Sequence, residues 1–262
     1  MNPAAARVAT ARRWFRRLGH EAIAAAPGIT VIASPDRPDT WDANFATADP
    51  GAGPEALFSA LDRHLAHSPW QVVAADALTD PAIEAALALS GHVAQPPLIE
   101  FIAHRPLASP HPLPVITTRA VRDENDWRTF AALVEIDHRE GLRTGTIDPA
   151  VAAGLLDGMR RRCPPADYWL IGSDDGPPLG YGLTLACPGG LGLIEHLFVL
   201  PEHRGRGVMS AFILSADERL RAADCDALFI DAHAGAPPAR LYASLGFTPV
   251  ALTREWVRHP RA

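Results

Sequence analysis

The chain has 262 residues, of which 48% are hydrophobic and 21% charged, which is typical of a soluble globular protein with one large or two modest domains. The formal net charge is −6 and no long block of basic residues occurs, so nucleic acid is not expected as the main partner. No stretch is apolar over the length of a membrane span, so no membrane partner is expected.

The three cysteines are Cys163, Cys187 and Cys225. They form an odd, scattered set without the spacing of metal ligands. Such a set indicates reduced thiols, a cytoplasmic protein and no bound metal. The sequence gives no indication of the oligomeric state.

An arginine-rich segment, residues 12–17, surrounds Trp14 and Phe15 near the N-terminus. A transit peptide or a twin-arginine signal would also be rich in arginine, but a signal needs an apolar run, and none follows before Glu21. We therefore expect an amphipathic helix that docks through Trp14, Phe15 and Leu18.

The first half of the chain predicts a short series of alternating elements that ends in a proline-rich segment. The segment from Pro106 to Pro114 has few helix or strand formers and predicts a semi-rigid linker between two domains, residues 1–110 and 111–262. The elements expected before the linker are helices at 55–67 and 80–90 and strands at 71–75 and 98–103.

The second half predicts the order β-α-α-β-β-β-α-β-α-β. Its second helix begins at Asp148 and Pro149, an N-cap followed by a first-turn proline. The expected strands are 115–118, 168–172, 179–186, 192–200, 227–232 and 247–257, and the expected helices are 125–138, 148–162, 208–223 and 237–245.

The segment from Val199 to Met209 joins an apolar strand to a helix through a turn that contains Gly205 and Gly207. Backbone N–H groups at a helix start are unpaired, and the helix dipole adds positive character there. Glycines allow a ligand to approach the backbone closely, and Arg204 and Arg206 add two positive charges. The segment therefore predicts a pyrophosphate-binding loop.

This loop resembles the acetyl-CoA-binding motif of the GNAT acyltransferases, Arg/Gln-x-x-Gly-x-Gly/Ala, and the order of elements matches the GNAT fold over about residues 114–258. Met209 departs from the motif, since it replaces a small residue. The resemblance implies a mixed-sheet α/β fold and acetyl-CoA as cosubstrate, with no metal. It also implies that the strand end offers backbone groups to the pantetheine arm. The cofactor-binding residues it implies are Leu197, Phe198, Val199, Arg204, Gly205, Arg206, Gly207, Val208, Met209 and Ser210.

A second signature of the family lies at Leu241-Tyr242 and Gly246-Phe247. Gly246 is also a good helix C-cap on physical grounds. The resemblance makes the Tyr242 hydroxyl the proton donor to the departing thiolate; the alternative is a half-buried tyrosine whose hydroxyl meets water. The family often places an asparagine seven residues before the tyrosine, where this chain has Gly235.

Glu195 lies on the strand that leads to the loop, near a position where the family often carries an acid. A carboxylate beside an apolar strand surface is expected to have a raised pKa and to accept the amine proton through a water. The alternative is a surface glutamate paired with an arginine. His196 is expected on the opposite face of the sheet unless a bulge intervenes.

Asp137 and Glu140 lie between the first two helices of the second half, with His138 and Arg143 nearby. In the family this segment lines the acceptor site, so Asp137 and Glu140 are expected to attract a cationic amine. A solvated helix end is the alternative interpretation.

The first half contains a possible internal repeat of the second. When Gly51 and Gly53 are aligned on Gly205 and Gly207, both halves continue as helix, strand and helix, and Gly91 falls one residue short of Gly246. Pro50, Trp41 and Leu87 then stand in place of Arg204, Glu195 and Tyr242, and Pro54 removes a backbone donor. We therefore interpret residues 1–110 as a truncated, degenerate GNAT-like α/β half.

Together these features predict a cytoplasmic N-acetyltransferase that transfers the acetyl group of acetyl-CoA to a primary amine. The acceptor is a small molecule or a peptide N-terminus, and the amine attacks directly in a ternary complex. Met209 and Gly235 leave an alternative open, a non-enzymatic acyl-CoA-binding or regulatory module. A third possibility is an enzyme for a longer acyl-CoA.

Overall fold

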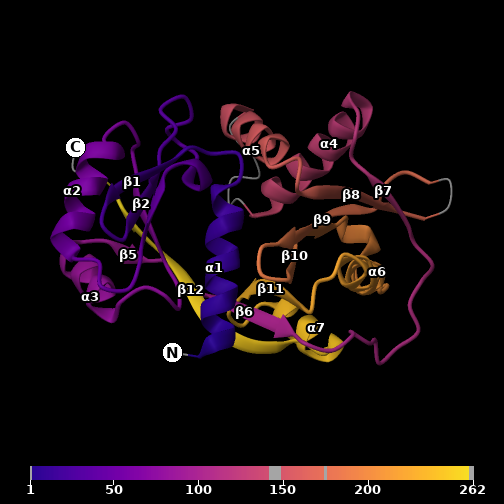
Figure 1. Ribbon diagram of the computed structural model, residues 1–262. Helices are drawn as coiled ribbons and strands as arrows, with labels where there is room; N and C mark the ends of the chain where they lie inside the picture. The colour runs from indigo at the N-terminus through magenta and orange to yellow at the C-terminus, as the bar shows by residue number, and fades with distance from the viewer. Residues whose placement is uncertain (1, 142–148, 174–175, 260–262) are drawn as a thin grey trace.

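One mixed β-sheet runs through both halves of the chain in the computed structural model, which describes residues 2–141, 149–173 and 176–259 (Figure 1). Twelve strands form this sheet within the described residues, in the order β1-β2-β3-β4-β12-β6-β11-β10-β9-β8-β7, with β5 pairing beside β12. No helix in the described part of the chain is long and apolar enough to cross a membrane.

The first half begins with a fifteen-residue helix and continues with short strands and two more helices. Its elements are α1 (Pro3–Arg17), β1 (Ala22–Ala26), β2 (Ile29–Ile32), the 3₁₀ turn η1 (Trp41–Ala43), β3 (Phe45–Ala48), α2 (Pro54–His64), β4 (Gln71–Ala75), α3 (Pro81–Leu89), β5 (Val93–Ala94) and β6 (Leu98–Ala103).

The second half follows the order of elements expected from the sequence, and its mixed α/β class is confirmed. Asp148, the expected N-cap of its second helix, lies outside the described residues. The elements are β7 (Thr117–Ala120), α4 (Glu124–Gly141), α5 (Pro149–Arg161), β8 (Asp167–Gly172), β9 (Gly180–Cys187), β10 (Leu191–Val199), the 3₁₀ turn η2 (Pro201–His203), α6 (Val208–Ala222), β11 (Ala227–His233), α7 (Pro237–Leu245) and β12 (Thr248–Arg258).

The two halves exchange their last strands. β6 of the first half lies between β11 and β12, antiparallel to both. The first part of β12, residues 248–253, pairs with β6, whereas residues 254–258 pair with β4 of the first half (Figure 1). A domain boundary at residues 110 and 111 stays a prediction, because the pairing of β12 joins the halves into one sheet.

Helices cover both faces of the second-half sheet. Phe130 on α4, Met159 on α5 and Phe15 on α1 share one apolar cluster with the inward side chains of β8, β9 and β10. α6 and α7 form a second cluster on the opposite face, around Phe212 and Leu245. α1 lies between the two halves and contributes to the first cluster, as the sequence predicts from Phe15 (Figure 1).

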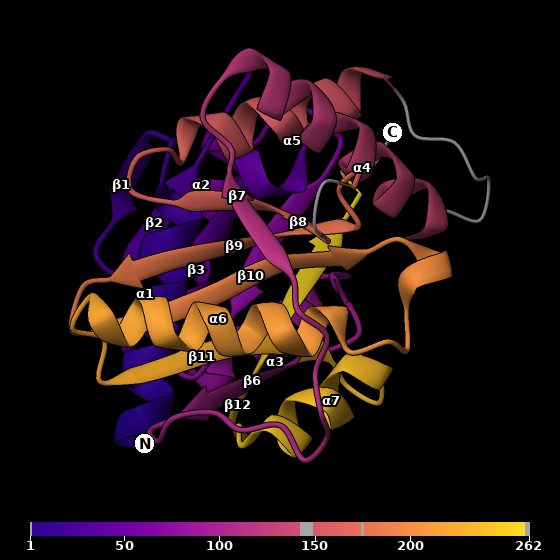
Figure 2. The same ribbon diagram turned by 90° about the vertical axis from the view of Figure 1, so that its right-hand side faces the viewer.

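Residues 104–116 form no regular element and run from β6 past α7 and α6 to β7 (Figure 2). This is the linker expected from the prolines. It does more than connect the halves, since Leu113 and Pro114 pack over Gly207 at the start of α6, where a Cβ would lie 3.0 Å from Pro114 Cδ.

The strands β1, β2 and β3 were not expected from the sequence. The residues Ala22–Ala26 are an alanine-rich run without alternation, so neither propensity nor periodicity indicates a strand there. β3 is buried at all four positions and therefore also lacks a period of two. α2 ends at His64, three residues earlier than expected.

Candidate functional site

The segment expected to bind a pyrophosphate forms a tight turn into α6. Gly205 and Gly207 have φ of +71° and +80°, a region that side chains with a Cβ rarely adopt. The first hydrogen bond of the helix runs from the Ala211 N–H to the Gly207 carbonyl at 2.9 Å. The amides of residues 208–210 precede that bond and are therefore the free donors of the helix start.

The turn opens onto a cavity of about 780 Å³. β10 and β11 pair in parallel only at 191–193 and 227–229, so the two strands diverge beyond that point. Leu197 and Val199 on β10 and Tyr242 on α7 line the cavity, together with residues 109–113 of the linker and the whole turn from 203 to 210. Phe198 points the other way, into the cluster under α4, and is 3% exposed.

Arg204 is held between the strand and α4. Its Nε donates to the Val199 carbonyl at 2.9 Å, and its Nη2 donates to a Glu140 carboxylate oxygen at 2.5 Å. Arg206 is exposed and lines the same cavity. The turn therefore presents two arginines and a row of free amides to one cavity, the donor set that suits a diphosphate.

Tyr242 is buried between Phe101 and Phe247, whose rings lie 6.0 and 6.1 Å from its own. Burial raises the pKa of the Tyr242 phenol, and the carboxylates of Asp231 and Glu195 act in the same direction. The phenol is therefore protonated over the physiological range, which is the state a proton donor needs.

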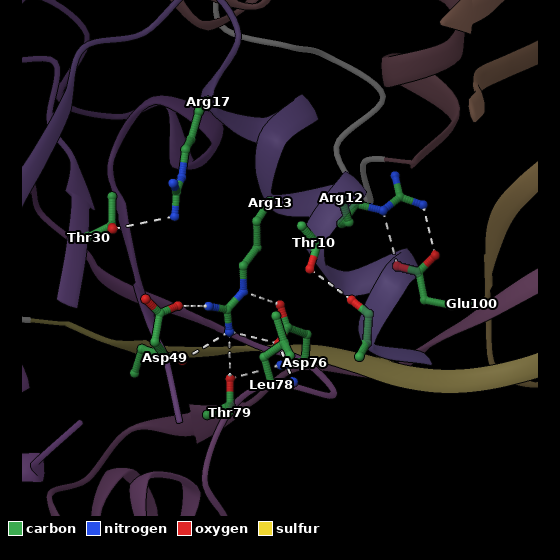
Figure 3. A network of polar contacts seen from close by, with 12 residues as sticks. Thr10, Arg12, Arg13, Arg17, Thr30, Asp49, Asp76, Leu78, Thr79 and Glu100 are labelled. Atoms are coloured by element: carbon green, nitrogen blue, oxygen red, sulfur yellow. Dashed lines mark hydrogen bonds and ion pairs between the residues drawn. The ribbon is translucent and has the colours of Figure 1, made fainter. Parts of the chain in front are cut away.

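Glu195 lies in a buried network centred on Arg12 of α1, of which Figure 3 shows Arg12 with Glu100. Arg12 donates to both carboxylate oxygens of Glu100, at 3.1 and 3.0 Å, and contacts Glu195 and Asp231. The Arg12 side chain is only 9% exposed and that of Glu100 only 1%. One guanidinium therefore faces three carboxyl groups from β6, β10 and β11.

The expectation of a raised pKa at Glu195 is wrong. Burial alone would raise it, but the attraction of Arg12, and then of His196, outweighs burial and leaves the pKa of Glu195 below its ordinary value. The raised values belong to Glu100 and Asp231, where burial is the largest cause and Arg12 offsets it only in part. The network therefore titrates as a coupled unit.

A bulge does intervene at His196. The pairing of β9 and β10 slips between Glu195 and Phe198, and His196 has φ of +50°. His196 consequently lines the same buried region as Glu195 instead of the opposite face. Burial lowers the pKa of His196 to about 4, so the imidazole is neutral at physiological pH.

Asp137 and Glu140 do not share a cavity. The Asp137 carboxylate accepts a hydrogen bond of 2.5 Å from the Tyr181 hydroxyl and faces a second cavity, whereas Glu140 pairs with Arg204 at the cofactor turn. Burial raises the pKa of Asp137. Arg143, named beside them in the sequence, lies outside the described residues.

Sequence reasoning missed the arginines that enter the core. Arg12 and Arg13 are 8% and 5% exposed, and Arg13 pairs with Asp49 and Asp76 (Figure 3). The signal was present for Arg12, which shares a helix face with Val8 and Phe15, but the partners of the two arginines lie 36 to 219 residues away along the chain. No local pattern identifies such partners.

The aligned loop of the first half lacks the conformation of the second. Gly51 has φ of +83°, but Gly53, aligned with Gly207, has φ of −84°. Pro54 is the first residue of α2 and has no N–H to offer.

In the described residues no group of three or more His, Cys, Asp or Glu side chains is arranged to hold a metal ion.

Comparison with known proteins places this geometry in a family. Residues 130–247 match the model of the acetyltransferase (GNAT) family. Residues 130–247 therefore match a GNAT domain, and this match supports acyl transfer in general. No curated protein matches the sequence significantly.

Solved structures show the same fold over most of the chain. A GCN5-related N-acetyltransferase from Kribbella flavida is 17% identical, with a TM-score of 0.69 over 100% of this chain and 98% of that one. A second GCN5-related N-acetyltransferase, from Sphaerobacter thermophilus, is also 17% identical, with a TM-score of 0.62 over 97% and 86%. A tandem GNAT protein from the clavulanic acid biosynthesis pathway is 18% identical, with a TM-score of 0.59 over 83% and 76%. These likenesses in fold extend over both halves of the chain and fit a first half that is itself GNAT-like.

Proposed function

We propose that the chain is an N-acetyltransferase that transfers the acetyl group of acetyl-CoA to a primary amine, by direct attack of the amine in a ternary complex. The acceptor is a small molecule or a peptide N-terminus, and the protein works in the cytoplasm. The observation that carries the proposal is the cavity of about 780 Å³ that joins the glycine turn, the diverging end of β10 and Tyr242.

The residues present fit acetyl-CoA. A Cβ at Gly205 would meet nothing within 4 Å, so the turn leaves open space in front of its backbone. The proposed diphosphate contacts are the amides of residues 208–210 with Arg204 and Arg206, and the proposed pantetheine contacts are the backbone of residues 197–199. Acetyl-CoA supplies an activated acyl group on a good leaving group.

Two proton transfers are assigned, one to Tyr242 in this cavity and one to Glu195 in the buried carboxyl network. Tyr242 donates a proton to the departing thiolate. Glu195 takes the proton of the attacking amine through water, as a member of the carboxyl network on Arg12 and not as an isolated base of raised pKa. Asp231 and Glu100, whose pKa values are raised, are the members of that network with the higher proton affinity.

The two halves have different tasks in this proposal. Residues 111–262 form the catalytic GNAT domain, and residues 1–110 form the degenerate one. Asp137 attracts the cationic acceptor, whereas Glu140 lies at the glycine turn, where it pairs with Arg204. The chain has no lysine, so its own side chains offer no competing amine.

Thiol release from acetyl-CoA, measured with a panel of polyamines, aminoglycosides, amino acids and short peptides, tests the proposal. We expect saturable release that depends on one class of amine, together with the N-acetylated product in a mass spectrum. Binding of acetyl-CoA without release for any amine would contradict the proposal and favour the acyl-CoA-binding module. Arg128→Met, on the exposed face of α4, serves as the matched control and should behave as wild type.

A further inference from the structure

A second cavity, of about 110 Å³, lies where the first half packs against α4 and α5. Its wall from the first half includes His20, Arg37 and Thr40, and its wall from the second half includes Asp137 and Arg162. A single buried water needs roughly 10–15 Å³ by this kind of measure, so the space suits a compact organic group.

Two guanidinium groups facing this cavity have unused donors. Arg162 is 4% exposed; its Nη1 lies 3.3 Å from His196 Nε2, while its Nε has no hydrogen-bond partner in the described residues. Nε and Nη1 of Arg37 are also buried without a hydrogen-bond partner there, although carboxylates of Asp36 and Asp157 lie 3.7 and 3.5 Å away. Buried donors without acceptors are costly, so this arrangement suits a molecule that brings acceptor oxygens.

The same cavity also contains negative charge. Asp137 and Asp42 line it, and Asp42 lies 3.7 Å from Arg162. Two of the lining histidines, His20 and His196, add no positive charge at neutral pH, since burial lowers the pKa of both to about 4. Two arginines and two aspartates therefore face one small space, which matches a molecule that carries both an anion and a cation.

Gly154 on α5 lies where the first half packs tightly against this helix, whereas Gly158 leaves room for a Cβ. A Cβ at Gly154 would lie 3.1 Å from Thr40 Oγ1, and a Cβ at Gly158 would lie 3.7 Å from Arg37 Nη1. The glycines are four residues apart, so they share one face of the helix. The arginine of the degenerate half is thus brought directly against the catalytic half.

The second cavity also lies next to residues of the carboxyl network and of the proposed acetyl-CoA cavity. His196 lines it from the bulge of β10, where it follows Glu195 of the carboxyl network and precedes Leu197 of the acetyl-CoA cavity.

We propose that this cavity binds the carboxylate of an amino-acid acceptor, with Arg37 and Arg162 as its donors and Asp137 facing its ammonium group. The inference rests on the proposed acetyltransferase activity and narrows its acceptor to small molecules with an amine and a carboxylate. The degenerate half then determines acceptor specificity, although it keeps no cofactor loop.

Matched acceptors test this directly. Each of the standard L-α-amino acids is compared with its C-terminal amide by thiol release from acetyl-CoA, with taurine and phosphoethanolamine as amines that carry other anions. We expect kcat/KM for at least one amino acid to exceed that for its amide by 10-fold or more. Equal use of acids and amides, or a preference for the sulfonate or phosphate, would overturn the inference and leave the proposed function standing. The absence of release with every amine would overturn both.

Variants of Arg37 separate a binding role from a structural one. Arg37→Met should raise KM for the amino acid by about 10- to 100-fold, with kcat and the KM for the amide within threefold of wild type. Arg37→Lys keeps the positive charge but loses the paired N–H donors of the guanidinium, so it should give an intermediate KM for the amino acid. This variant also tests the assignment if Arg37→Met does not fold. Arg128→Met is the matched control. An equal effect of Arg37→Met on acid and amide would contradict the assignment.

Discussion

Replacing Arg12 by methionine should destabilise the protein in a way that depends strongly on pH. The substitution keeps the apolar stem and removes the one cation that, among the residues the structure describes, forms ion pairs with Glu100, Glu195 and Asp231. Breaking a buried ion pair by removing one partner costs about 3–5 kcal/mol, because the remaining charge is left uncompensated. At this chain length about 2 °C of melting temperature corresponds to 1 kcal/mol, so the expected loss is about 6–10 °C.

The sign of the pH dependence follows from the direction of each shift. The depressed pKa of Glu195 gives stability that is present above its ordinary value and is lost as the pH falls. The raised pKa values of Glu100 and Asp231 act in the opposite sense, since their stabilising protonated forms are lost as the pH rises through the folded-state values. Without Arg12 burial raises the pKa of all three carboxyl groups, and the protein loses stability as they ionise. The loss of melting temperature in the variant should therefore be larger at pH 8 than at pH 5.

Thermal melts of wild type and variant at pH 5 and pH 8, followed by circular dichroism, measure the effect. Arg7→Met is the matched control, because Arg7 lies on the same helix and pairs with Asp226 at the surface, where the two side chains are 32% and 64% exposed. An exposed pair contributes about 0–1 kcal/mol, so this control should melt within about 2 °C of wild type. The reasoning would be refuted if Arg12→Met lowered the melting temperature no more than Arg7→Met does. It would also be refuted if Arg12→Met lowered the melting temperature more at pH 5 than at pH 8.

Variants of Tyr242 and Glu195 test the two proposed proton transfers. Tyr242→Phe removes one hydroxyl and little volume, so calorimetry should give an unchanged affinity for acetyl-CoA while turnover falls by about 10²–10⁴-fold; near-full activity would mean that water or another group is the acid. Glu195→Gln should depress the rate most at low pH, where more of the acceptor amine is protonated, and should recover in part as the pH rises. The wild-type carboxylate stays ionised over an assay range of about pH 6–9 because the pKa of Glu195 is lowered. If the pH–rate profile of Glu195→Gln kept the wild-type shape, Glu195 would have no role in proton transfer and would only pair with Arg12.

Local patterns in the sequence predicted most of the second half. Gly205 and Gly207 indicated a turn that only glycine adopts easily, and the structure gives both a positive φ. Gly246 indicated a helix C-cap, and it ends α7 with φ of +110°. These features depend on a few adjacent residues, which is why they can be recognised without a structure.

Features that depend on distant residues could not be predicted. Arg12 and Glu195 are 183 residues apart, and no periodicity relates them, so the pKa of Glu195 was expected to move in the wrong direction. The pairing of β12 with β4 is equally remote, since Trp256 meets Val73. The cavity around Arg37 is lined by residues of both halves, and Gly154 of the second half lies close to Thr40 of the first.

The central claim is that the turn of the second half, and not its counterpart in the first, binds acetyl-CoA. Calorimetric titration of acetyl-CoA into wild type and Gly207→Val tests it most directly, because valine at φ of +80° is strained and its Cβ would meet Pro114 Cδ at 3.0 Å. We expect one site per chain in wild type and none in the variant, with the variant still folded by circular dichroism. Two sites per chain, or an unchanged affinity in a folded Gly207→Val variant, would contradict the account.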